Sequence, residues 1–159
     1  MTRKEQYNQL ILQIAGLIKD ETNLVGILAN VSAALHDTFP ERFFWVGFYL
    51  QENGNMLRLG PFQGSVACYV IPFGKGVCGK AWEEERTLIV PDVEKFPGHI
   101  ACSSLSRSEI VVPMYDDSHT FRGVLDIDST RLNDFNEDDK EGLERIIELL
   151  MAETQDLFQ

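Results

Sequence analysis

The sequence predicts an α+β fold in which a central, mostly antiparallel β-sheet is flanked by helices and a ligand pocket is covered by loops. Three observations support this prediction. The chain begins with two apolar stripes at helical spacing, continues with short segments whose apolar residues alternate, and ends with a third helical stripe. Helices that precede and follow a run of strands are typical of an antiparallel sheet. With 159 residues and no internal repeat, linker or low-complexity segment, the chain is expected to form a single domain, residues 1–159.

The N-terminal segment predicts two helices. Apolar residues recur at a spacing of three to four from Tyr7 to Ile18, and a second stripe of the same kind runs from Leu24 to Leu35. The polar residues 20–23 between the two stripes offer capping side chains. The second helix is expected to end before Pro40.

A β-hairpin is predicted next. From Phe43 to Leu50 the period changes to two, so the side chains should alternate between the two faces of a strand. One face would carry Phe44, Val46, Phe48 and Leu50, and the other Phe43, Trp45, Gly47 and Tyr49. The pair Asn53-Gly54 is a strong turn signal, and a returning strand is expected over residues 56–59.

The middle of the chain predicts short elements and one long loop. Residues 68–71 suit a brief strand that ends at Pro72, a short helix is expected over 80–85, and another strand over 87–90. From Pro91 to about Arg107 no period is visible. A segment of this length without regular structure is more often a lid or a binding loop than a simple connection.

The C-terminal part predicts two strands and a helix. The strands are expected over 109–114 and 121–128, joined by a polar turn at 116–119. Asn136 can cap the final helix. The apolar stripe of that helix consists of Leu143, Ile146, Ile147, Leu150 and Leu157.

Composition and charge exclude several classes of partner. The net charge is −11, from 25 acidic and 14 basic residues, and no basic cluster offsets it, so nucleic-acid binding is not expected. The first residues lead into an amphipathic pattern rather than an apolar run, which argues against a secretory signal. No stretch approaches the length of a membrane span. We therefore expect a cytoplasmic protein that does not bind a membrane.

The three cysteines, Cys68, Cys78 and Cys102, are candidates for chemistry. An odd number of cysteines in a reducing compartment argues against a structural disulfide framework and leaves packing, metal binding or redox chemistry. With His99 they could supply four zinc ligands, but no C-x-x-C pair is present, which disfavours zinc. A reactive thiolate is favoured at a helix N-terminus, which suits Cys78, or in an open polar loop, which suits Cys102. The residues alone leave this choice open.

Carboxylates and aromatic residues are candidates for the lining of a ligand site. Asp126 and Asp128 lie two residues apart in a predicted strand and so share a face, where they would either form a functional pair or the solvent face of an edge strand. Glu109, at the start of the preceding strand, is a plausible neighbour, and carboxyl groups brought close together raise one another's pKa. Trp45 and Tyr49 share a strand face and suit either a ligand wall or ordinary packing.

Five segments and the cysteine spacing carry a resemblance to a known family. The segments are 44–49 (FWVGFY), 59–64 (LGPFQG), 71–79 (IPFGKGVCG), 108–113 (SEIVVP) and 123–129 (GVLDIDS), and the cysteines are spaced by ten and then twenty-four residues. In these features the chain closely resembles the free methionine-(R)-sulfoxide reductases, which are built on a GAF domain. The resemblance covers nearly the whole chain, and the cysteine spacing is its most specific part.

This resemblance implies an oxidoreductase that reduces free L-methionine-(R)-sulfoxide by thiol chemistry. Cys102 would be the nucleophile and Cys68 the resolving thiol, with Cys78 as a second thiol able to accept or relay the disulfide. A second cysteine converts the sulfenic acid on the nucleophile into an intramolecular disulfide. Thioredoxin would then restore the thiols.

The resemblance also implies the substrate pocket and the assembly. Glu109, Asp126 and Asp128 would line the pocket, and Trp45 and Tyr49 would hold the methyl end of free methionine sulfoxide. No cofactor and no metal are expected. The family and an apolar stripe expected to be exposed on the N-terminal helix imply a homodimer.

Two other interpretations compete with this one. A GAF domain can be a non-enzymatic sensor of a small molecule or of redox state, although this chain shows no output domain or linker to which it could transmit a signal. A structural zinc protein would carry stoichiometric metal. Turnover with a dithiol reductant separates the enzyme from the sensor.

Overall fold

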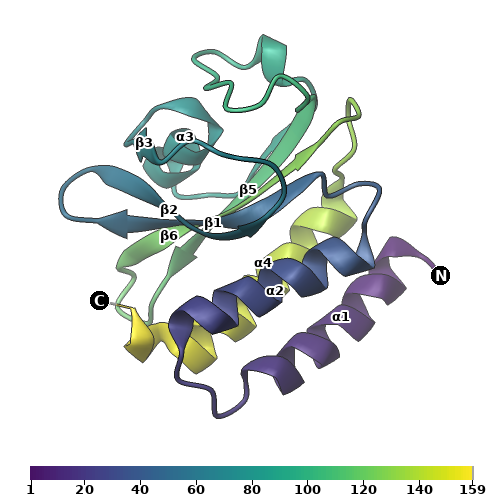
Figure 1. Ribbon diagram of the computed structural model, residues 1–159, viewed down its shortest axis with the longest axis vertical. Helices are drawn as coiled ribbons and strands as arrows, with labels where there is room; N and C mark the ends of the chain where they lie inside the picture. Colours follow the sequence, from purple (N-terminus) through teal and green to yellow (C-terminus); the bar gives the residue numbers. More distant parts are fainter. Residues whose placement is uncertain (159) are drawn as a thin grey trace.

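A computed structural model describes residues 1–158 and confirms the predicted α+β architecture. One six-stranded sheet has the strand order β3-β2-β1-β6-β5-β4, and every neighbouring pair is antiparallel. Figure 1 shows α1, α2 and α4 together on one face of the sheet, and α3 with the long loop before β5 on the other. The elements are α1 (Arg3–Ile18), α2 (Leu24–Thr38), β1 (Trp45–Glu52), β2 (Met56–Gln63), β3 (Val70–Pro72), α3 (Gly76–Glu84), β4 (Leu88–Val90), η1 (Val93–Lys95), β5 (Ser108–Tyr115), β6 (Phe121–Ser129), α4 (Glu137–Thr154) and η2 (Gln155–Leu157).

The three helices on one face enclose the larger core. The predicted cap is confirmed at α4, where the Asn136 side chain accepts hydrogen bonds from the first turn in a capping box. The stripe of α1 was predicted to be exposed, and this is wrong: Tyr7, Leu10, Ile14 and Ile18 are all buried. They are covered because α1 packs on α4, from the other end of the chain. The exposed large apolar side chains of α1 are Leu12 and Leu17.

The alternation along β1 separates the two faces of the sheet. Val46 and Phe48 lie in the core under the helices, whereas Trp45 and Tyr49 lie in the smaller cluster on the opposite face, as predicted. The prediction is wrong for Phe43 and Phe44, which lie on the reverse sides: Phe43 joins the helical core and Phe44 packs against the other cluster. Both precede the first residue of β1, so the strand period does not apply to them.

Two boundaries differ from the predicted ones in ways that matter for the site. α3 begins at Gly76, whose positive φ of 62° suits glycine, so Cys78 lies in the first turn of a helix instead of in a bend before it. β3 begins at Val70, which leaves Cys68 in the loop before the strand. The loop over 91–107 holds the short turn η1 and otherwise has no helix or strand. No helix in the described part of the chain is long and apolar enough to span a membrane.

Candidate active site

A pocket lies on the sheet face opposite the three long helices, between α3 and the loop over 91–107. It encloses a volume of about 40 Å³. Of the eight residues predicted for the site, seven line it, and the eighth is bonded to one of the seven. The lining residues from that prediction are Trp45, Tyr49, Cys78, Cys102, Glu109, Asp126 and Asp128. The sequence prediction of the site therefore corresponds to one place in the fold.

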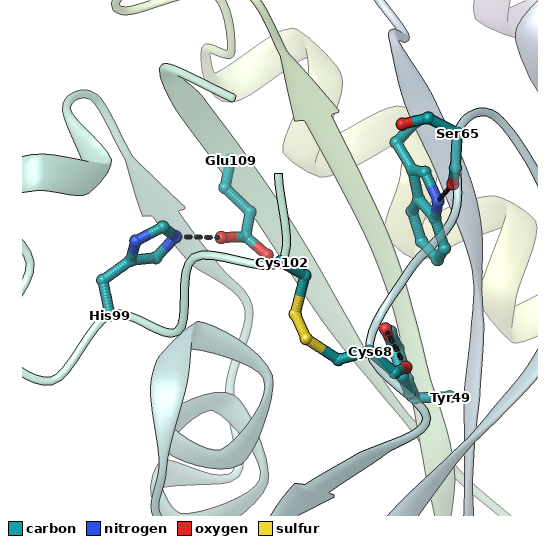
Figure 2. Close-up of a disulfide and its surroundings, with 7 residues drawn as sticks. Tyr49, Ser65, Cys68, His99, Cys102 and Glu109 are labelled. Carbon is teal, nitrogen blue, oxygen red and sulfur yellow. Dashed lines mark hydrogen bonds and ion pairs between the residues drawn. A yellow bond between two sulfur atoms is a disulfide. The ribbon is translucent and has the colours of Figure 1, made fainter. Parts of the chain in front are cut away.

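Two of the three cysteines form a disulfide. Cys68, before β3, is bonded to Cys102, in the long loop, with their Cα atoms 5.5 Å apart (Figure 2). Bonded to one another, these sulfurs cannot act as thiolate ligands in this form. This removes two of the four ligands from the zinc site considered on sequence grounds.

Cys78 is free and buried. Its position in the first turn of α3 favours a thiolate, but burial raises the pKa of its thiol well above the usual value, and the nearby carboxylate of Asp126 raises it further. Of the two candidates that the sequence left open for a reactive thiolate, Cys78 is therefore the less favoured. Desolvation and neighbouring negative charge outweigh the helix terminus, and Cys78 is a neutral thiol.

Three carboxyl groups meet at the floor of the pocket. Glu109 on β5 is the register partner of Asp128 on β6, and Asp126 lies two residues before Asp128 on the same face. Because β6 lies between β1 and β5, the interpretation of these aspartates as the solvent face of an edge strand is wrong. Burial raises the pKa of Glu109 and of Asp128 well above the usual range, and the nearby carboxylate of Asp126 raises both further.

Within this group, Asp126 is the member best suited to carry the negative charge. Burial raises its pKa, but hydrogen bonds donated by protonated Glu109 and by the Cys78 thiol favour its ionised form and offset part of that effect. Its Oδ1 atom is buried and has no hydrogen-bond partner among the described residues. A buried carboxylate oxygen without a partner costs free energy, and a cationic ligand group could satisfy it.

Trp45 and Tyr49 form an aromatic wall beside the carboxyl groups. Both are buried, and their rings stack at a centroid distance of 5.9 Å. The Trp45 Nε1 donates to the Ser65 carbonyl at 3.0 Å, and the Tyr49 hydroxyl donates to the Cys68 carbonyl at 2.9 Å (Figure 2). Because backbone carbonyls occupy the polar tips of both rings, the rings offer the pocket an apolar surface.

His99 is a pocket residue that the sequence suggested only as a zinc ligand. Its ring lines the cavity, and its Nε2 lies 3.8 Å from Glu109 Oε1 (Figure 2). Burial lowers the pKa of His99, so the ring is mainly neutral at pH 7. The available signal was its place three residues before Cys102 in a loop predicted to cover a ligand.

The chain is similar to known proteins over nearly its full length. A family model described as a GAF domain matches residues 21–152. The chain is 57% identical to GAF domain-containing protein A of Dictyostelium discoideum, over 94% of this chain and 92% of that protein. It is 43% identical to the free methionine-R-sulfoxide reductase of Saccharomyces cerevisiae, over 94% of this chain and 86% of that protein. The solved structure of free methionine-R-sulfoxide reductase from Neisseria meningitidis, in complex with its substrate, superimposes with a TM-score of 0.93 at 46% identity, over 98% of this chain and 92% of that one.

Proposed function

Because this chain belongs to the free methionine-R-sulfoxide reductase family of GAF-domain proteins, we propose that it reduces free L-methionine-(R)-sulfoxide to methionine. One observation carries the proposal: the Cys68–Cys102 disulfide lies at a pocket lined by three carboxyl groups, of which Glu109 and Asp126 are buried. A thiol pair that can release two electrons and a group that can release a proton are what sulfoxide reduction needs.

The reaction begins at Cys102 in the reduced protein. Its thiolate attacks the sulfoxide sulfur, the S–O bond breaks, and the oxygen is transferred to give a sulfenic acid on Cys102 and free methionine. The Cys68 thiol then attacks this sulfenic sulfur, water leaves, and the disulfide forms. The two thiols have lost two electrons, and the sulfoxide has gained them.

The carboxyl groups supply the proton in this proposal. The S–O bond breaks readily only when the oxygen is protonated, and a carboxyl group with a raised pKa can donate that proton near neutral pH. Among the three carboxyl groups of the pocket, Glu109 and Asp128 are the two whose pKa burial and the carboxylate of Asp126 raise well above the usual range. We assign proton donation to this pair and the binding of the substrate ammonium to Asp126, whose Oδ1 has no partner among the described residues.

The same arrangement supports specificity for the free amino acid. None of the pocket-lining residues in the described part of the chain is lysine or arginine, so a cationic group meets only attraction there. The ammonium of a free amino acid can pair with Asp126. A peptide-bound or N-acetylated residue has lost that charge and would leave the buried carboxylate unpaired.

We expect N-acetyl-methionine-(R)-sulfoxide to be reduced with a kcat/KM about 10²-fold or more below that of the free amino acid, because a buried polar group left unpaired discriminates strongly. Free methionine-(S)-sulfoxide should be spared as well, since its oxygen points away from the proton donor when the ammonium and methyl ends are held. Turnover of the resolved epimers with dithiothreitol measures both. Similar rates on free and N-blocked substrate would contradict the role of Asp126, and no turnover on either would favour the sensor.

Thioredoxin is the proposed reductant. Its thiolate would attack the disulfide, and its second thiol would release the two cysteines of this chain as thiols while thioredoxin becomes oxidised. The surface beside the disulfide supports contact with a protein, because Val66, Tyr69 and Leu105 are 87%, 79% and 59% exposed. Exposed apolar side chains around a reactive bond suit a protein partner.

Replacing Tyr69 and Leu105 together with serine should raise the KM for thioredoxin about five- to tenfold, as the loss of interface anchors does. Turnover driven by dithiothreitol should stay unchanged, because a small reductant needs no docking surface. Val25→Ser is the matched control, since Val25 is 68% exposed but lies on α2, behind the sheet. Equal losses with both reductants would show that the substitutions disturb the site itself.

We also propose a homodimer in the cytoplasm. The exposed Leu12 and Leu17 on α1 support an interface on the helical side, which sedimentation equilibrium tests directly. A catalytic cycle that must return through free thiols supports a reducing compartment.

A further inference from the structure

We propose that this pocket also binds a divalent cation of borderline softness, typically Zn²⁺, through Cys78, Glu109 and Asp126. One donor atom from each, the Cys78 Sγ and one carboxylate oxygen of each acid, lie within 4.8 Å of one another. All three residues are buried, and they come from α3, β5 and β6. Rigid elements therefore hold the three donors together.

A second observation, the hydrogen bonding of Asp126, also points to a cation. The Asp126 side chain is more than nine-tenths buried, and its Oδ1 lacks a hydrogen-bond partner within the described chain. A buried carboxylate oxygen in that state is incompletely satisfied. An ion among the three donors would complete it.

The donor set selects the class of metal. Ca²⁺ and Mg²⁺ prefer oxygen ligands alone, whereas Zn²⁺ accepts sulfur, nitrogen and oxygen in tetrahedral sites. Water would take the fourth position, or His99 after a movement of its ring, since its Nε2 lies 3.8 Å from Glu109 Oε1. Ligand atoms around a tetrahedral zinc lie roughly 3.2–3.8 Å apart. The three donor atoms lie within 4.8 Å of one another, so small side-chain rotations would bring them to that spacing. Binding releases the protons carried by Cys78 and Glu109 to solvent, and no electron is transferred.

This site would compete with the substrate. The ion takes the Asp126 oxygen that we assign to the substrate ammonium, so the two cannot bind together. The competition rests on the proposed function, but binding of the ion does not. Free Zn²⁺ would then be a reversible inhibitor of the reductase.

Cobalt(II) is the probe for this test, because a thiolate ligand gives Co²⁺ a charge-transfer absorption in the near ultraviolet that oxygen ligands do not give. The protein is the full chain carrying Cys68→Ser and Cys102→Ser, in which Cys78 is the one remaining thiol. We expect one equivalent of Co²⁺ to produce the band and Zn²⁺ to abolish it. Adding Cys78→Ser should remove the band, adding Asp126→Asn should weaken Co²⁺ binding about tenfold or more, and Asp117→Asn, on the exposed 116–119 turn, should change nothing.

Several results would overturn the proposal. One is Co²⁺ binding without the charge-transfer band, which would mean binding to surface carboxylates. Another is a band of equal affinity in the Asp126→Asn protein. A band that free methionine sulfoxide does not displace would overturn the competition. The Cys68→Ser, Cys102→Ser protein cannot turn over, so its Co²⁺ binding does not depend on the reductase activity. A normal band together with an inactive wild-type protein would contradict the proposed reductase function and leave the metal site supported.

Discussion

The Cys102→Ser protein should release no methionine when it is mixed with one equivalent of substrate in the absence of reductant. Without the Cys102 sulfur, no sulfenic acid can form and the oxygen has no acceptor. The Cys68→Ser protein should still release about one equivalent per active site, because resolution follows the chemical step. Rapid-quench measurement of methionine, with the thiols reduced beforehand, distinguishes these results.

Cys78→Ser is the matched control for this experiment. Its thiol is buried, and its pKa is raised by burial and by Asp126, so it should not act as the nucleophile. We expect the Cys78→Ser protein to give a burst of the same size as the wild type. A stoichiometric burst from the Cys102→Ser protein that disappears when Cys78 is also replaced would move the nucleophile to Cys78. The buried thiol would then have to be exposed by a movement of α3.

Replacing Asp128 with asparagine should lower the single-turnover rate by roughly 10²- to 10⁴-fold, the usual contribution of general acid catalysis. Asparagine keeps the shape and the hydrogen-bonding capacity of the side chain but has no carboxyl proton to give. Asp126→Asn should show a related loss that falls more on KM, because we assign Asp126 to the ammonium. Stopped-flow mixing of reduced enzyme with a series of substrate concentrations in excess separates the effect on the maximal rate from the effect on substrate affinity.

Folding should survive both substitutions, since asparagine has nearly the shape of aspartate and, at Asp126, removes the cost of burying a charge. Circular dichroism and thermal unfolding check this. If both variants reduced the substrate at nearly the wild-type rate, neither aspartate would take part, and the proton would have to come from Glu109 or water. Glu109→Gln, measured in the same way, would then decide between these two sources.

Local patterns in the sequence were sufficient to predict most of the elements and the composition of the pocket face. Alternation alone put Asp126 and Asp128 on one face, and it put Trp45 and Tyr49 together. It could not show whether the strand of Asp126 is central or at an edge, because the order of strands depends on contacts between distant segments. The exposed stripe predicted on α1 has the same cause. α4 covers that stripe, and α4 lies over a hundred residues away in the chain.

Local patterns also could not predict which cysteines form the disulfide or which thiol stays buried. Cys68 and Cys102 are separated by 34 residues and lie in loops without a period, so the residues alone could not pair them, and the pairing came from the family resemblance. For Cys78, the glycines on either side predict a bend, whereas Gly76 starts α3. The effect of burial on its pKa depends on Glu109 and Asp126, which the folded sheet brings to it.

The disulfide across the pocket has a consequence for the order of events. It ties the loop before β3 to the loop after η1, and Cys102 from the second loop lines the pocket. Because a sulfur in a disulfide is not a nucleophile, we expect the substrate to react with the dithiol form and the reductant with the disulfide form. In the proposed cycle each reactant converts the protein into the form that the other needs, so we expect ping-pong kinetics.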